Sequence, residues 1–220
     1  MQHRFDRNTE ERGVTCAIAD TTEMRDQVYR LRYSGYFRRG SIDARADERF
    51  SDRFDAEPNH FSILARDAAG AAVATVRISV VRRDLDWTES PGGAVFADHP
   101  AFQRLAAESF VEASRLVFAP QARRDALMQL LGYMAAMADF YETEWLMACP
   151  RLEHSTTYQR LFGFRPMAEP RPYHGVKFET GLLAVRRSEI KDRVCEAKPM
   201  RLAWSTALTK LGSASRFAFS

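Results

Sequence analysis

Residues 108–120, ESFVEASRLVFAP, form an apolar run that two opposite charges interrupt. Burying an unpaired charge is costly, so charges inside such a run either pair or take part in chemistry. A β-strand sends alternate side chains to opposite faces, which separates Glu112 from Arg115. The two converge only where a β-bulge re-aims one of them. The alternative interpretation is a half-exposed edge strand that carries ordinary surface charges.

Two other sets of residues have chemically active side chains. Cys149 and His154 resemble a nucleophile followed by its base. A cysteine at the end of an apolar strand is usually a core residue, however, so we do not assign catalysis to this pair. His99, His154 and His174 lack the spacing of metal ligands, and the sequence therefore predicts no metal site.

The composition is that of an ordinary globular protein. With 220 residues, of which 45% are hydrophobic and 28% charged, the chain can bury a substantial core. A net charge of +3 does not require nucleic acid as a partner. The scattered Cys16, Cys149 and Cys195 argue against a disulfide framework. The polar residues 1–13 and the lack of a long apolar run predict neither a signal peptide nor a spanning helix, so we expect a cytoplasmic protein.

Hydrophobic periodicity predicts one domain over residues 1–190 and a basic amphipathic tail over 191–220. The expected strands are 14–19, 61–67, 71–84, 110–118, 145–149 and 173–185, and the expected helices are 21–37, 121–142 and 151–163. Residues 84–107 read as a loop-like insertion. Strands and helices in this order imply a mixed sheet with helices packed on it, which is an α/β (α+β) fold.

Five short motifs occur along this series. They are VYRLRYSGYF (28–37), SDRFD (51–55), VATVRIS (73–79), VEASRLVF (111–118) and TYQRLFGF (157–164). Together, over roughly residues 14–185, they resemble the autoinducer-synthase-like branch of the GNAT acyltransferases, and most nearly the N-acyl amino acid synthases. Phe50 and Ala74 replace a loop Glu and a strand Gly of that branch, which disfavours lactone chemistry more than the fold.

The resemblance implies a mixed, mostly antiparallel sheet, splayed by a bulge in its fourth strand, with helices on both faces. It also implies attack of an amine on an acyl thioester, for which Glu112 is the candidate general base. Tyr158 is the candidate proton donor to the departing thiolate, unless it is a core residue. Backbone N–H groups freed by the bulge would bind the oxyanion. They belong to Leu116, Val117 and Phe118.

The same resemblance implies a charged cluster over the acceptor amino acid. Its expected members are Arg32, Asp52, Asp55, Arg77 and Arg115. Ordinary ion pairs are the alternative for each arginine. We expect residues 38–60, which read as too polar to bury themselves, to be a mobile lid that orders when donor and acceptor bind.

The acyl donor can be predicted from a missing glycine turn. Acetyl-CoA-dependent GNATs hold the pyrophosphate on backbone N–H groups at a helix start, but Arg124 occupies the glycine position here. An acyl carrier protein offers one phosphate and an acidic surface instead, which Arg123, Arg124, Arg151 and Arg160 could face. The alternatives are an acyl-CoA donor and a merely solvated basic face.

We therefore expect an N-acyltransferase that moves a fatty acyl group from acyl carrier protein to the α-amine of an amino acid. It would need no cofactor besides its acyl carrier protein or acyl-CoA donor substrate. The alternatives are an acyl-homoserine-lactone synthase, and a non-catalytic module that binds lipid or carrier protein. The tail segment 198–212 could pack on the body, lie on a membrane surface or contact a partner.

Overall fold

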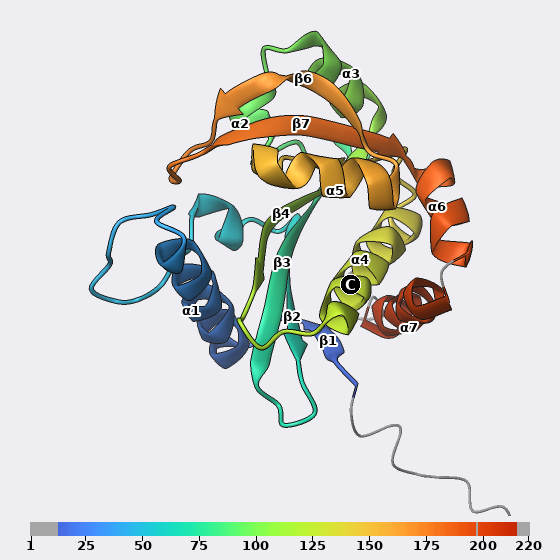
Figure 1. The fold of residues 1–220 in the computed structure, drawn as a ribbon. Helices are drawn as coiled ribbons and strands as arrows, with labels where there is room; N and C mark the ends of the chain where they lie inside the picture. The colour runs from blue at the N-terminus through green and yellow to red at the C-terminus, as the bar shows by residue number, and fades with distance from the viewer. Residues whose placement is uncertain (1–12, 197, 215–220) are drawn as a thin grey trace, which may run out of the picture.

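The computed structural model describes residues 13–196 and 198–214, which build one seven-stranded sheet with helices on both faces (Figure 1). The strands lie in the order β1-β2-β3-β4-β5-β7-β6. Neighbouring strands are antiparallel except β4 and β5, which are parallel. Their bounds are β1 Thr15–Ile18, β2 His60–Arg66, β3 Ala72–Val81, β4 Phe110–Phe118, β5 Trp145–Ala148, β6 Arg165–Pro172 and β7 Glu179–Arg186.

Helices α1 and α4 cover opposite faces of this sheet. Helix α1, Thr22–Arg38, begins at Thr21, whose hydroxyl accepts a hydrogen bond from the Met24 N–H. Its Val28 packs with Leu64 of β2. Helix α4, Arg124–Phe140, packs on the core cluster that contains the preceding residue of β2, Ile63. Because successive strand residues point to opposite faces, the two helices enclose the sheet.

The two faces of β3 differ in polarity although both are buried. Val76, Ile78 and Val80 join the apolar core under α4. The intervening Thr75, Arg77 and Ser79 are also fully buried, on the α1 face. The α1 face is therefore the polar interior of the molecule.

The predicted bulge lies in β4. Between two matched pairs, β3 advances from Thr75 to Arg77 while β4 runs from Val117 back to Ser114, so β4 carries one extra residue. Arg115 takes a left-handed backbone conformation at this place, with φ of 56°. The pairing of β4 with β5 ends at Ala113 and Ala148, so the strands part where the bulge begins. The sheet is splayed there.

The expected loop over residues 84–107 is wrong in part. After the 3-10 turn Arg83–Leu85, the segment contains α2, Gly93–Phe96, and α3, Pro100–Glu108. Helix α3 starts with proline at its first position, where the missing N–H costs nothing, and the His99 side chain caps it. Phe96, Phe102 and Leu105 of these helices pack in a second core beneath β7.

The predicted tail boundary at residue 190 falls inside α6, Arg187–Glu196. The next helix, α7, Lys198–Ala214, packs closely on α4: a Cβ on Gly132 would lie 2.5 Å from that of Ala203. Of the three alternatives for the tail, its described part packs on the body. The N-terminal residues 1–12 and the end of the tail, 215–220, lie outside the described residues. In the described parts of the chain, no helix is long and apolar enough to cross a membrane.

Candidate functional site

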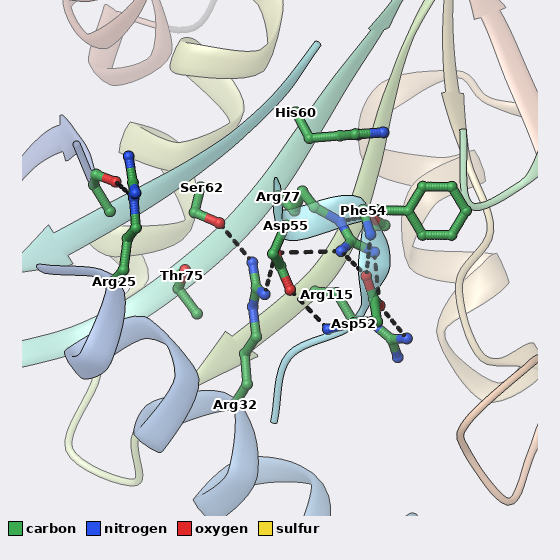
Figure 2. A network of polar contacts seen from close by, with 12 residues as sticks. Arg25, Arg32, Asp52, Phe54, Asp55, His60, Ser62, Thr75, Arg77 and Arg115 are labelled. Carbon is green, nitrogen blue, oxygen red and sulfur yellow. Dashed lines mark hydrogen bonds and ion pairs between the residues drawn. The ribbon is translucent and has the colours of Figure 1, made fainter. Parts of the chain in front are cut away.

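The five charged residues that the motifs singled out meet in one network on the α1 face (Figure 2). Asp52 accepts hydrogen bonds from Arg77 Nη1 at 2.5 Å and from Arg115 Nη2 at 2.8 Å. Asp55 lies 2.7 Å from Arg32 Nη1 and 3.2 Å from Arg77 Nη1. We call these five residues the ion cluster. Each arginine in it has a carboxylate partner.

The segment SDRFD folds so that its own backbone aims both carboxylates. Asp52 caps the 3-10 turn Arg53–Ala56 by accepting from the Phe54 N–H, while Asp55 accepts from the Asp52 N–H. Phe50 and Phe54 are buried. The expectation that residues 38–60 are too polar to bury themselves is therefore wrong in part: Phe50 and Phe54 anchor the second half, whereas residues 43–48 are exposed.

Burial and charge act in opposite directions on the ion cluster. Burial alone would raise the pKa of the Asp52 carboxyl, but hydrogen bonds and charge from Arg77 and Arg115 hold it well below its usual range. Burial lowers the pKa of Arg32 in spite of Asp55. Three arginines against two aspartates leave one net positive charge.

That excess charge lies beside aromatic rings. The Arg115 guanidinium is 4.7 Å from the ring centre of Phe50, 5.4 Å from that of Tyr173 and 5.7 Å from that of Tyr36. Such contacts stabilise a cation over the faces of the rings.

Glu112 is held in a different way. Its side chain is fully buried, and both oxygens accept from the Gly92 N–H, at 3.0 and 2.9 Å. Among the described residues no cation forms an ion pair with it. Burial raises the pKa of Glu112 to about 7, although the Gly92 N–H, the Ser90 hydroxyl and nearby arginine charges oppose this. Glu112 and Arg115 thus lie near each other without pairing.

Two cavities lie on either side of Arg115. The first, of about 230 Å³, opens where β4 and β5 part and is enclosed by α1, α4 and α5, Leu152–Phe162. The second, of about 260 Å³, lies between the Asp52 loop, residues 91–95 and the turn at 173–175. Arg115 lines both cavities. It therefore forms part of the wall between them.

Other predicted residues line the first cavity. Leu116, Val117 and Phe118 do so from β4, and the bulge leaves Leu116 without a partner residue on β3 in the described register. Tyr158 lines it from α5 while its ring packs edge-on against Phe164, 5.6 Å between centres. Burial raises the pKa of Tyr158, so the hydroxyl keeps its proton at neutral pH.

The predicted donor-binding arginines do not come together there. Arg123 and Arg124 are exposed at the start of α4 and do not line the first cavity, and Arg123 lies 3.9 Å from Asp125. Arg151 does line it, whereas Arg160 is exposed on α5. Burial raises the pKa of Cys149 well above its usual value, which disfavours a thiolate. In the described ranges no three His, Cys, Asp or Glu side chains come together as a metal ion would require.

The sequence interpretation missed two residues that complete the site. The Gly92 N–H donates to the catalytic candidate Glu112, and a Cβ there would lie 2.6 Å from Met147 Cε and 3.1 Å from Glu112 Oε2, so a larger residue would displace the ends of these side chains. Gly92 belongs to the Pro-Gly-Gly run 91–93 inside the expected loop-like insertion, and such a run indicates only a turn. Tyr173 lines the second cavity, and no sequence pattern distinguishes it from other tyrosines.

Comparison with solved structures identifies the fold. The chain is similar to FeeM, an N-acyl amino acid synthase from uncultured soil microbes, with a TM-score of 0.68 and 15% identity over 86% of this chain and 98% of that one. It is also similar to BjaI, a CoA-dependent acyl-homoserine lactone synthase, with a TM-score of 0.57 and 16% identity over 84% of this chain and 89% of that one. A third similar structure is an acyl-CoA N-acyltransferase from Pseudomonas aeruginosa, with a TM-score of 0.51 and 16% identity over 78% of this chain and 97% of that one. The fold is that of the GNAT acyltransferases.

A family comparison goes further than the fold. Residues 27–186 match the model of the family described as N-acyl amino acid synthase FeeM. The chain therefore belongs to the FeeM family and is an N-acyltransferase. No curated protein sequence is similar enough to count as a match. The predicted resemblance and fold class are confirmed.

Proposed function

We propose that this protein transfers a fatty acyl group from acyl carrier protein to the α-amine of an amino acid. The observation that carries the proposal is the pair of cavities that meet at Arg115, with the raised-pKa carboxyl of Glu112 beside their common wall. A transfer between two substrates needs both reacting atoms at one point, and this wall is the point the cavities share.

The first cavity suits the acyl thioester. Its wall is rich in apolar side chains, which suit an acyl chain and the pantetheine arm. Arg38, Arg39, Arg151 and His154 lie together on the same cavity, and cations are suited to a phosphate on that arm. Arg123 and Arg124 lie outside this group, so we assign them to the acidic surface of the carrier protein.

The second cavity suits an amino acid. Asp52, which is partly exposed, lies on its wall and can attract an ammonium group. Arg45 and Arg53 lie on the same cavity and suit a carboxylate. Opposite charges on one small cavity match the two charges of a free amino acid.

The reaction forms a C–N bond and breaks the C–S bond of the thioester. The acceptor amine, having lost one proton to solvent, attacks the carbonyl and must then lose a second, for which Glu112 is the base. Backbone N–H groups at residues 116–118 would stabilise the oxyanion. Tyr158, which stays protonated, would give its proton to the departing thiolate.

Mass spectrometry of a defined reaction tests this proposal. Purified protein is incubated with acyl carrier protein that bears a labelled C14 or C16 chain and with mixed amino acids, and a parallel reaction contains acyl-CoA. We expect N-acyl amino acids, formed faster from the carrier protein. Labelled lactones formed only when S-adenosylmethionine is supplied, or no product from any acceptor, would contradict the proposal. The predicted cytoplasmic location fits substrates of this kind.

A further inference from the structure

A short turn before α2 holds Glu112 through its backbone. Residues 90–93, with the sequence Ser-Pro-Gly-Gly, lead into α2, and we call them the Ser90 turn. The Gly92 N–H donates to both carboxylate oxygens of Glu112, at 3.0 and 2.9 Å. No other backbone N–H among the described residues donates to this carboxylate. The direction of this one N–H therefore decides how well the charged form of Glu112 is stabilised.

The Ser90 side chain fixes the shape of the turn. It is 2% exposed, and its hydroxyl oxygen accepts a hydrogen bond from the Gly93 N–H at 3.0 Å. The Ser90 carbonyl accepts from the Ala94 N–H at 3.1 Å. The peptide unit of Gly92 lies inside the ring that the bond from Gly93 to Ser90 Oγ closes. Because glycine backbone is otherwise free to rotate, this bond restricts where the Gly92 N–H points.

The Ser90 turn also borders the second cavity. Pro91 lines that cavity, and so do Ala94 and Val95, which follow the turn. Glu112 itself lines neither cavity. The Ser90 turn therefore contacts Glu112 on one side and the cavity that suits the acceptor on the other.

Glu112 is the group in its surroundings that changes charge near neutral pH. The charged and titratable side chains that face it are Arg77 of β3, Arg115 of β4, Cys149 after β5 and Tyr173 in the turn between β6 and β7. The two guanidinium groups stay charged. Burial raises the pKa of Cys149 and of Tyr173 well above their usual values, so both keep their protons. A titration near pH 7 at this place therefore reports Glu112.

We propose that the Ser90 turn sets the basicity of Glu112, and that Ser90 is a positioning residue that holds the Gly92 N–H on the carboxylate. This inference rests on the proposed function, in which Glu112 takes the proton of the acceptor amine. Burial raises the pKa of Glu112 and the Gly92 N–H opposes the rise, so loosening this N–H raises the pKa further. More of the carboxyl is then protonated at pH 7 and cannot act as a base.

The pH dependence of kcat in Ser90→Ala tests the role of the side chain. The midpoint should move upward by about 0.5–1 pH unit, so that kcat at pH 7 falls about 2- to 5-fold and returns at higher pH. Ser90→Thr keeps the hydroxyl and should retain the wild-type midpoint. The matched control is Ser109→Ala. Ser109 is 8% exposed and its hydroxyl oxygen accepts from the Glu144 N–H at 3.1 Å, so this variant loses a similar bond elsewhere and should keep the midpoint.

A measurement on Gly92 itself does not depend on catalysis. The proton chemical shift of its amide, observed by NMR with labelled glycine, should titrate with an apparent pKa near 7 in the wild type and with a higher one in Ser90→Ala. A shift that stays constant between about pH 5.5 and 8.5 in the wild type, or equal midpoints in the two proteins, would overturn the inference. Absence of acyl transfer by a wild type whose Gly92 titrates as expected would contradict the proposed function alone, so the two failures are distinguishable.

Discussion

The charges buried on the α1 face fall into two groups that are held in different ways. In the ion cluster, each of three arginines has an aspartate partner at 3.2 Å or less. Glu112 lies on the same face of the sheet, opposite Ser79 of β3, yet it has only neutral donors. The charges of the ion cluster nearly cancel one another, whereas Glu112 has no charged partner and its pKa is raised to about 7.

The difference suits the two groups to different roles, one structural and one catalytic. Paired charges resist a change of protonation, and they tie the Asp52 loop to β3 and β4. A carboxyl with a pKa near neutrality accepts and releases protons at little cost, which suits a general base. We therefore propose that the ion cluster, two of whose members line the second cavity, has a structural role, and that Glu112 takes the proton.

The largest effect is expected from Glu112→Gln. The amide keeps the shape of the side chain but cannot take a proton, so kcat should fall between about 10²- and 10⁴-fold while circular dichroism and melting stay close to wild type. Steady-state kinetics with saturating substrates measure this. Glu108→Gln, on the surface beside Trp145, is the matched control and should keep wild-type kcat. A fully active Glu112→Gln enzyme would remove Glu112 from the mechanism.

Asp55→Asn is expected mainly to lower the stability of the fold. It leaves the guanidinium of Arg32 buried without a carboxylate, which costs about 3 kcal/mol in the free energy of unfolding. Urea denaturation measures it. The control is Asp43→Asn, which breaks an exposed pair with Lys177 and should cost less than about 1 kcal/mol. Equal losses in the two variants would mean that the ion cluster holds nothing together.

The smallest effect is expected from charge reversal outside both groups. Changing Arg123 and Arg124 together to Glu should raise the KM for acyl carrier protein by about 5-fold and leave kcat nearly unchanged, because exposed charges guide the encounter only. Arg104→Glu, exposed on α3, is the control and should leave this KM unaltered. An unchanged KM in the double variant would assign the two arginines to a solvated face.

Much of the fold is predictable because it depends on local patterns. The apolar alternation of residues 110–118 matches β4, and Gly163, with φ of 73°, ends α5 as expected for a C-terminal glycine. The unpredicted elements break those patterns. Strand β6 contains three prolines, which only an edge strand tolerates, and α2 begins within a Pro-Gly-Gly run that reads as a turn.

The candidate site likewise contains some residues that the sequence predicts and others that it does not. The members of the ion cluster carry charge inside motifs, so sequence alone could single them out. Sequence could also suggest the bulge, because Glu112 and Arg115 conflict with strand alternation. The contact of Gly92 with Glu112 and the unpaired hydroxyl of Tyr173 depend on packing between distant segments. That packing cannot be predicted from residue types or their spacing in the sequence.

The pH dependence of kcat, measured for the wild type and for Glu112→Gln, tests the central claim most directly. A base must be deprotonated to act, so the wild-type kcat should rise with pH and level off above an apparent pKa near 7, the value to which burial raises Glu112. The residual activity of Glu112→Gln should lack this inflection. A wild-type profile that is flat between about pH 5.5 and 8.5, or the same inflection in both proteins, would contradict the assignment of Glu112 as the base.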